Sequence, residues 1–477
     1  MKKFPKLLVL IFAFVLCLSN LPVATTLADE PTITLRVCNC EDYIDEEVCS
    51  DFEEYMASKG KTVKVEYSTY GINENLYNDL KIAKGYLYDV ICTSDYMIEK
   101  MAIEGMLKKI TLSDANETVS PYIQEIFNEK ITWGNGDKLG DYAVPYMWGT
   151  LGLVYNPEIV KEEDMKSWLS LWNSEYKNKS TIKDSVRDSY FIGIADAYYE
   201  ELTALDKNAS DYNSRLTEIF GNVSDDAINK VQISLSTLKD NIFGFEVDSG
   251  KNDMVTGKIS INFAWSGDAV YAIDEAESDD LFLRYSVPEE GSNVWFDGWC
   301  VPTHAKNAEI AQEFIEYMAT PEVAIKNMEY TGYTSGIAGD EVLTWLMDYY
   351  SLGESESEQT PYATDLTYFF GKPVTVYSSE EGRQFSAQYP TQDVINRCVI
   401  MRAFNDETNK KINQMWENVK GQVFPTWAII LVIVSVVFVA VTIILLRNKE
   451  WVKERLAKIP VKQKQNKYKV IKIEEIR

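Results

Sequence analysis

The chain has 477 residues, a net charge of −26 and a single histidine, His304. This length is sufficient for two or three lobes with their own cores. One histidine excludes most acid–base and nucleophilic sites, since a Ser-His-Asp or Cys-His arrangement is hard to build around it and an HExxH zinc helix is absent. We expect His304 to lie in a surface loop.

The charge is distributed unevenly along the chain. Residues 447–477 carry +7 and residues 1–28 carry +3, so residues 29–446 carry −36. Such a field repels nucleic acid and attracts cations, polycations most of all. The pattern is also consistent with solubility alone.

The N-terminus has the pattern of a secretory signal peptide. Lys2, Lys3 and Lys6 precede an apolar run over 7–18, and Thr26-Leu27-Ala28 offers a cleavage site. We predict a signal peptide over 1–28, with an uncleaved N-terminal anchor as the alternative. Leu16 before Cys17 argues against lipid attachment.

A second apolar segment lies near the C-terminus. Residues 428–446 contain no charge, Trp427 precedes them, and a basic tail follows. Nineteen such residues are enough to cross a bilayer, and the positive-inside rule puts the tail in the cytoplasm. We predict a transmembrane helix over 427–446, a cytoplasmic tail over 447–477 and a single-pass protein whose acidic domain lies outside the cell.

The acidic domain begins with alternating strands and helices. Strands are predicted at 33–37, 63–67 and 88–92, with helical spacing between them, which implies a parallel sheet. Ligands bind such sheets beyond the carboxyl ends of the strands. Asp42, Tyr43, Ser94 and Tyr96 lie at those ends, although Asp42 and Ser94 also suit helix capping.

The middle of the chain is predicted to cross into a second lobe. Two extended runs over 142–156 meet at Gly149, a short helix is expected at 167–172, and 182–188 is expected to be a strand followed by a turn. A strand over 259–265 places Trp265 at its end. Core packing of this indole is an equally good interpretation.

Trp295 and Asp297 stand two residues apart in the stretch Asn293–Pro302. In an extended segment both side chains point to the same side. An indole beside a carboxylate suits an alkyl-ammonium ligand, because the ring covers methylenes or the cation while the carboxylate accepts N–H donors. The alternative is a strand that buries Trp295, with Asp297 in a turn.

The rest of the domain offers fewer functional patterns. Ile310, Phe314 and Met318 share a helix face, Thr320-Pro321 begins another helix, and 330–335 is a predicted loop. Residues 351–385 are rich in Ser, Glu and Gly and are predicted to be an exposed excursion. A polar helix is expected over 405–419.

Several short motifs, in their order and spacing, resemble those of the spermidine/putrescine-binding proteins of polyamine ABC transporters. The resemblance covers about residues 33–420 and rests on the following segments: Asn39–Tyr43, Ser68–Tyr70, Tyr88–Val90, Ser94–Tyr96, Val144–Gly149, Trp168–Trp172, Trp265–Gly267 and Trp295–Asp297. It implies an α/β fold of the two-lobed type II periplasmic-binding-protein class, hinged by crossing strands. We expect lobe 1 over 29–145 and 297–345, and lobe 2 over 146–296 and 346–420.

The resemblance also implies a ligand site. Trp265 and Trp295 would wall a methylene chain, Asp297 would pair with an ammonium group, and Asp188 would stand where the family has Glu. The first lobe would contribute Asp42, Tyr43, Ser94 and Tyr96, with Tyr333 beside the ligand. The implied partners are a polyamine and an ABC permease. We expect a monomer that is not an enzyme and that needs no metal or cofactor.

The chain departs from the family pattern at three positions. Cys40 replaces an aromatic residue, Ser185 an Asp and Met401 a Gln, which favours a shorter diamine or another cation. Two other functions fit the sequence: a membrane-tethered sensor for a small organic cation, and a carbohydrate-active enzyme with paired carboxylates.

Overall fold

The computed structural model describes residues 32–110, 118–134, 136–352 and 362–421, together with 434–435, 437–439 and 442–443. Residues up to Val419 form one compact unit, and those from Lys420 onward form a second. The predicted signal peptide and basic tail lie outside the described residues, as does most of the predicted transmembrane segment. Within the described residues, no helix combines the length and apolar character that crossing a membrane requires.

One long mixed sheet runs through the compact unit in the strand order β2-β1-β3-β11-β6-β9-β7-β8. Its first three strands are parallel and form the sheet of lobe 1, as the alternation of strands and helices predicted. They are β1 (Ile33–Cys40), β2 (Val63–Tyr70) and β3 (Val90–Ser94). Four of the five residues of β3 are buried, which is typical of a parallel strand covered on both faces.

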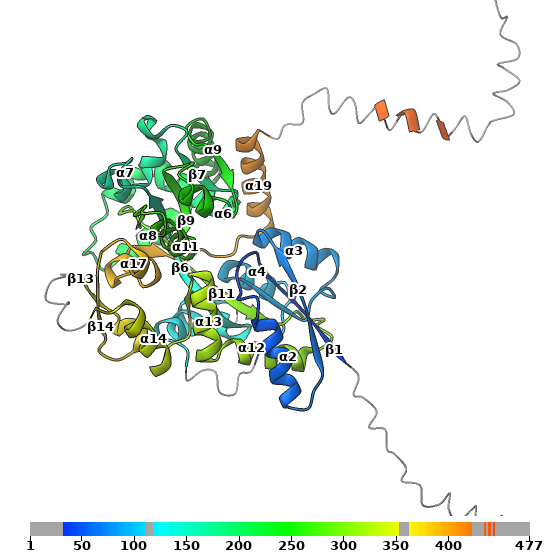
Figure 1. Cartoon of the computed structure of the whole chain (residues 1–477). Helices are drawn as coiled ribbons and strands as arrows, with labels where there is room; N and C mark the ends of the chain where they lie inside the picture. The colour runs from blue at the N-terminus through cyan, green and yellow to red at the C-terminus, as the bar shows by residue number, and fades with distance from the viewer. Residues whose placement is uncertain are drawn as a thin grey trace, which may run out of the picture. The chain divides into compact units, whose positions relative to one another are not determined.

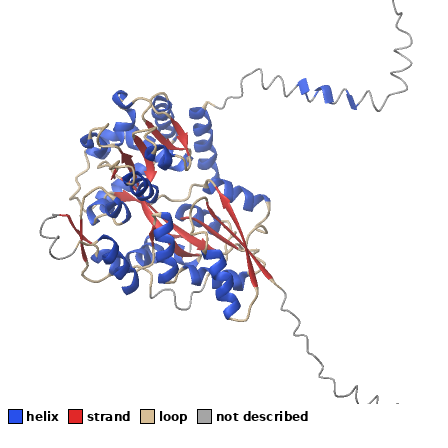
Figure 2. Ribbon diagram, viewed as in Figure 1, coloured by secondary structure: helices blue, strands red, loops and turns tan. Residues whose placement is uncertain are grey.

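Helices cover this part of the sheet (Figures 1 and 2). They are α2 (Val48–Ser58), α3 (Asn73–Ile82), α4 (Asp95–Ile103), α12 (Ala308–Met318) and α13 (Pro321–Thr331). Ile310, Phe314 and Met318 are buried on one face of α12, as predicted. Short elements follow α4 in the chain: α5 (Pro121–Glu125), η2 (Ile126–Lys130), β4 (Thr132–Trp133), β5 (Asp137–Lys138) and η3 (Leu139–Asp141).

Two antiparallel strands connect the lobes, β6 (Ala143–Tyr155) and β11 (Ser292–Cys300). The first half of β6 pairs with β11 and the second half with β9, so one continuous strand serves both lobes (Figure 1). The predicted lobe boundaries at 145/146 and 296/297 fall inside these strands and stay predictions. The crossing near Gly149 is confirmed, because Gly149 lies in the middle of β6.

Lobe 2 contains the other half of the sheet and its own helices. Its strands are β7 (Ser180–Lys183), β8 (Gly244–Glu246), β9 (Ile261–Trp265) and β10 (Arg284–Ser286). Its helices are η4 (Glu162–Lys166), η5 (Trp168–Trp172), η6 (Ser174–Tyr176), α6 (Val186–Ala197), α7 (Tyr199–Thr203), α8 (Tyr212–Phe220), α9 (Asp225–Lys239), α10 (Gly250–Val255) and α11 (Ser266–Glu277).

The last part of the domain packs against both lobes. Its elements are β12 (Thr334–Ser335), α14 (Asp340–Tyr350), β13 (Tyr362–Asp365), α16 (Thr367–Phe370), β14 (Thr375–Ser378), α17 (Gln384–Gln388), α18 (Gln392–Asn396), β15 (Cys398–Val399) and α19 (Asp406–Lys420). The prediction of an exposed excursion over 351–385 is wrong for part of the described residues: Tyr362 and Tyr377 are exposed, but other side chains enter the core. Phe369 is fully buried and stacks on Trp148, with ring centroids 5.7 Å apart.

Candidate functional site

A cavity lies between the lobes, where the first three strands of lobe 1 and strand β9 of lobe 2 end. Its empty space, with the open solvent at its mouth included, is about 950 Å³. All nine residues predicted from the sequence line it: Asp42, Tyr43, Ser94, Tyr96, Asp188, Trp265, Trp295, Asp297 and Tyr333. Cys40, Ser185 and Met401, where the chain departs from the family pattern, line it too.

Strand β11 carries Trp295 and Asp297 into the cavity on the same side, as their spacing predicted. The register between β11 and β6 shifts between Phe296 and Gly298, so the sheet is irregular beside Asp297. A Cβ at Gly149 would lie 2.7 Å from Trp295 Cζ2 and would also overlap the Ser266 hydroxyl. The absence of a side chain at Gly149 therefore leaves room for the Trp295 indole to pack against β6.

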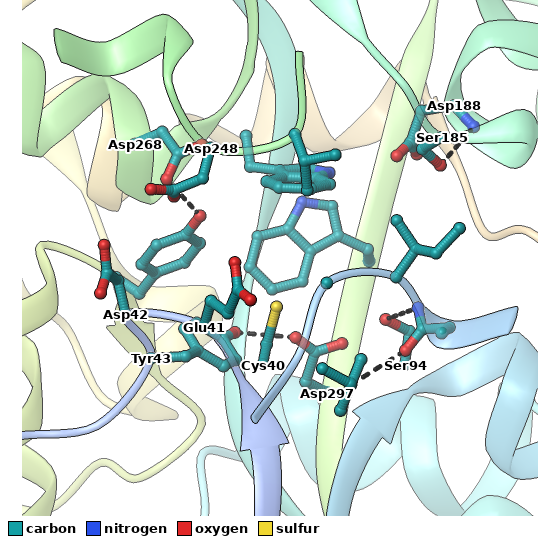
Figure 3. Close-up of a pocket in the computed structure, with 18 of the residues that line it drawn as sticks. Cys40, Glu41, Asp42, Tyr43, Ser94, Ser185, Asp188, Asp248, Asp268 and Asp297 are labelled. Atoms are coloured by element: carbon teal, nitrogen blue, oxygen red, sulfur yellow. Dashed lines mark hydrogen bonds between the residues drawn. The ribbon is translucent and has the colours of Figure 1, made fainter. Parts of the chain in front are cut away.

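The Asp297 carboxylate is only partly satisfied by the protein. Tyr43 Oη donates a hydrogen bond to Oδ2 at 2.8 Å, whereas the buried Oδ1 accepts none from the described residues (Figure 3). Burial raises the pKa of Asp297 to about 6, and the hydroxyls of Ser94 and Tyr43 offset this only in part. A carboxylate in this state gains from a cation that brings N–H donors.

Asp188 lies in the first turn of α6, not in the turn that the sequence predicted. Ser185 ends the extended segment and caps the helix, with its hydroxyl accepting from the Asp188 backbone N–H at 3.4 Å. Burial raises the pKa of Asp188 to about 6; Ser185 lowers it and the charge of Glu74 raises it. No basic side chain among the described residues lies within ion-pair distance of Asp188.

The Ser94 and Tyr96 hydroxyls belong to a polar network at the end of β3. Asn73 Nδ2 donates to Ser94 Oγ at 2.9 Å and to Tyr96 Oη at 3.2 Å, and Tyr96 Oη donates to Glu74 Oε1 at 3.2 Å. Ser94 stands at the N-cap position of α4, as the alternative interpretation predicted, although its side chain makes no cap hydrogen bond. This network fixes the hydroxyls that face the cavity.

The opposite side of the cavity contains a buried ion-pair cluster. Lys183 Nζ lies 2.8 Å from Asp268 Oδ2 and 3.1 Å from Glu246 Oε1, and Lys183 has no solvent exposure. The same ammonium lies 4.3 Å from the centroid of the Trp265 ring. Although burial raises the pKa of Asp268, Lys183 and Lys251 hold it below its ordinary value. Trp265 thus already has a cation on its ring.

Tyr333 completes this cluster. Its hydroxyl donates to Asp268 Oδ1 at 2.8 Å, so both carboxylate oxygens of Asp268 have partners within the chain. A Cβ at Gly267 would overlap the Tyr333 ring, so glycine permits the ring to lie on the start of α11. The ring also makes edge contacts with Tyr43 and Trp295, at centroid distances of 4.8 and 5.7 Å.

Lys251 links the two lobes at the same side. It stands in the first turn of α10 in lobe 2, with Nζ 2.7 Å from Asp248 Oδ1 and 3.5 Å from Asp42 Oδ2 of lobe 1. Asp42 is exposed and adopts a left-handed backbone conformation (φ 49°) after β1. Figure 3 shows Asp42, Asp248 and Asp268 on one side of the cavity, and Asp188 with Ser185 on the other.

We name these two regions by their charge pairing. The paired side comprises Asp42, Lys183, Glu246, Asp248, Lys251 and Asp268. The unpaired side comprises Glu74, Asp95, Asp188 and Asp297, none of which has a basic side chain within 4 Å among the described residues. The cavity therefore combines carboxylates that already hold cations with carboxylates that do not.

Several of these groups were not predicted from the sequence. Glu74, Asp95, Lys183, Asp248, Lys251 and Asp268 were not among the predicted site residues. Lys183 gave a usable signal, because a lysine at the end of the buried strand β7 requires a carboxylate partner nearby. Asp95 follows Ser94 directly and could have been included with it. Lys251 and Asp248 lie in an irregular segment with no periodic pattern.

This arrangement suits the binding of a small organic cation. Carboxylates supply acceptors and indole rings supply apolar and cation-binding faces. His304 is exposed in a turn, as expected, and lies outside the cavity lining. Within the described residues, no group of His, Cys, Asp and Glu side chains is arranged to hold a metal ion.

Comparisons with known proteins agree with the fold and with the resemblance. Residues 48–339 match the family model described as bacterial extracellular solute-binding protein. A curated relative, the spermidine/putrescine-binding periplasmic protein of Salmonella typhimurium, is 29% identical over 315 residues, which cover 65% of this chain and 80% of that protein.

Two solved structures share the architecture. The spermidine/putrescine ABC transporter substrate-binding protein PotD from Streptococcus pneumoniae is 26% identical, with a TM-score of 0.54, over 81% of this chain and 98% of that one. The TpPotD lipoprotein of Treponema pallidum is 17% identical, with a TM-score of 0.58, over 81% and 99%. The prediction of a two-lobed α/β periplasmic-binding-protein fold is confirmed. Because the family model spans more than half of its length, the chain belongs to the bacterial extracellular solute-binding protein family.

Proposed function

We propose that this chain is the extracytoplasmic substrate-binding subunit of an ABC transporter, that it captures a polyamine of the putrescine or spermidine kind between its lobes, and that it delivers the ligand to a permease. Support comes from the names of its relatives, from the strongly acidic domain and from the chemistry of the cavity. Membership of a family of solute-binding proteins supports a binding role rather than catalysis.

The observation that carries the proposal is the state of Asp297. A buried carboxylate oxygen without a hydrogen-bond donor is costly, so it indicates a partner that arrives with the ligand. A polyamine ammonium provides charge and N–H donors together. Trp295 lies beside this carboxylate and can cover the adjacent methylenes, which adds on the order of 1–2 kcal/mol per desolvated aromatic contact.

The residues of the cavity have distinct proposed roles. Asp297 and Asp188 pair with the two ammonium groups of the ligand, and Trp295 and Trp265 line its methylene chain. Hydroxyl groups complete the site, from Tyr43, Ser94, Tyr96 and Tyr333. Asp42 lies at the mouth, where its exposed carboxylate attracts cations more than it binds them.

A further part of the proposal concerns the two ends of the chain. We propose that the signal peptide exports the chain, and that the apolar segment 427–446 anchors it with the basic tail in the cytoplasm. The support is the absence of charge from 428–446 and the cluster of lysines and arginines that follows. We further propose that the chain acts as a monomer.

Isothermal titration calorimetry of the full-length chain tests the binding function. Putrescine or spermidine should produce saturable heat, whereas glucose and maltose should produce none. The absence of binding heat with every polyamine, confirmed by an unchanged melting temperature at millimolar ligand, would remove the polyamine from the proposal. Saturable heat with a sugar would favour the carbohydrate alternative.

A further inference from the structure

We propose that Lys251, supported by Lys183, occupies the place of a ligand ammonium on the paired side, so that the cavity accepts a short diamine and discriminates against a triamine. The inference rests on the proposed polyamine-binding function and specifies its ligand class.

The carboxylates of the paired side are already engaged by the protein. Asp268 Oδ2 accepts from Lys183 and Oδ1 from Tyr333. Glu246 accepts from the Gly250 N–H at 2.8 Å and lies 3.1 Å from Lys183 Nζ. The remaining two, Asp248 and Asp42, share Lys251. A ligand ammonium that entered here would find no carboxylate without a cation.

Lys251 is the residue of this side that a ligand would meet. It lines the cavity, whereas Lys183 is fully buried beneath it. Two ammonium groups that share one set of carboxylates repel each other strongly in a partly buried site. A third ligand amine would therefore compete with Lys251 for Asp248 and Asp42, and displacement of that lysine would break both of its ion pairs.

The unpaired side has the opposite property. Asp297 has a free buried oxygen, and Asp188 and Glu74 have no ion pair among the described residues. These carboxylates require added positive charge, and two ammonium groups on a short chain supply it. Figure 3 shows Asp188 across the cavity from Asp42 and Asp248, the partners of Lys251, so an ammonium held by Asp188 lies away from that lysine.

A second resident cation precedes Asp188 in α6 but lies outside the cavity lining. The Arg187 guanidinium lies 4.3 Å from the Tyr96 ring centroid and 3.7 Å from that of Phe404, and it donates to the Arg402 carbonyl at 2.8 Å. Among the described residues, Lys251 is thus the basic side chain that lines the cavity, and the length limit rests on it.

The decisive comparison is the ratio of the dissociation constants for spermidine and putrescine. We would measure it calorimetrically with the full-length wild-type chain, with Lys251→Met and with the charge-retaining Lys251→Arg. Lys258→Met is the matched control, since Lys258 follows the same helix and pairs with Asp253 at 3.0 Å, outside the cavity. The wild type should bind putrescine at least about tenfold more tightly than spermidine. Lys251→Met should shift the ratio toward spermidine by at least about tenfold, and the two other variants should leave it unchanged.

The outcomes separate this inference from the proposed function. If the wild type binds spermidine as tightly as putrescine, or if Lys251→Met folds and leaves the ratio unchanged, the length limit is wrong while polyamine binding stands. If the wild type binds no polyamine, the proposed function is wrong, and the length limit, which rests on it, is wrong as well. The wild-type ratio decides the question even if Lys251→Met does not fold.

Discussion

The two sides of the cavity contain similar numbers of carboxylates but differ in how the charge is balanced. On the paired side the chain supplies Lys183 and Lys251, and the pKa of Asp268 lies below its ordinary value. On the unpaired side no lysine or arginine forms an ion pair, and burial raises the pKa of Asp188 and of Asp297 to about 6. Aspartate therefore has a lysine partner on one side and has no basic partner among the described residues on the other.

This difference shows how a protein can prepare a cation site without filling it. Burying an ionised carboxylate costs free energy unless a cation accompanies it. On the paired side that cost is met during folding, because the lysines are part of the chain. On the unpaired side, under the proposed function, it is met on binding, so affinity for a cation is gained at the expense of the stability of the ligand-free protein. Substitutions on the two sides should therefore have opposite effects.

The largest effect is expected from Asp268→Asn on the paired side. Lys183 would remain fully buried with one carboxylate fewer, and breaking a buried pair in this way costs about 3–5 kcal/mol. Urea denaturation of the full-length chain measures the free energy of unfolding. Asp340→Asn is a control, since the side chain of Asp340 is 91% exposed and solvent screens its ion pair with Lys372, so its loss should leave stability nearly unchanged. A loss below about 1 kcal/mol for Asp268→Asn would show that the cluster does not stabilise the fold.

Asp297→Asn should have the opposite effect on stability and a large effect on binding. The neutral amide cannot pair with an ammonium group, so the affinity for putrescine should fall at least about tenfold. The pKa of Asp297 in the folded protein lies above its value in the unfolded chain. The buried carboxyl is therefore tolerated at low pH, where it is protonated, and destabilises the ligand-free fold as pH rises through about 6. The ligand-free variant should therefore melt higher than the wild type at pH 8 and at the same temperature near pH 4. Unchanged affinity would make Asp297 an ordinary strand residue.

Putrescine affinity should also depend on pH in a defined direction. Asp188 and Asp297 both bind protons below about pH 6 in the ligand-free protein, and a protonated carboxyl cannot pair with an ammonium. The ligand amines, like a lysine side chain, stay charged throughout. Affinity should be constant above about pH 7 and should fall by up to about tenfold per pH unit for each carboxyl below pH 6. Titrations from pH 5 to 8 test this, and a flat profile would mean that neither carboxylate binds the ligand.

The sequence predicted the parallel sheet and the position of the cavity because both depend on local patterns. Strand periodicity located β1, β2 and β3, and the two-residue spacing of Trp295 and Asp297 placed both side chains on one side. These features need only backbone geometry, and the resemblance to a family supplied the rest of the site.

The balance of charge could not be predicted in this way. Lys183, Lys251 and Asp268 come from β7, α10 and α11, and their contacts depend on how these elements pack. Asp188 was predicted to lie in a turn, but strand β7 ends at Lys183 and helix α6 already begins at Val186. A connection this short gives no periodic pattern that would reveal the change from strand to helix. The mistaken excursion over 351–385 has a similar cause, since its polar composition conceals Phe369, which packs on Trp148.

The smallest effect is expected from the hydroxyl groups that serve each side, compared through Tyr43→Phe and Tyr333→Phe. Tyr43 donates a side-chain hydrogen bond to Asp297 at 2.8 Å, so its loss should raise the pKa of Asp297 further and weaken putrescine binding about three- to tenfold. Tyr333 donates to Asp268, which keeps Lys183 as a partner, so Tyr333→Phe should change the affinity less.

Because the two variants remove the same atom from neighbouring rings, the comparison isolates the carboxylate to which each hydroxyl donates. An upward shift in the midpoint of the pH profile for Tyr43→Phe alone would assign the titration to Asp297, whereas equal losses in both variants would mean that the two sides do not differ in how they meet the ligand.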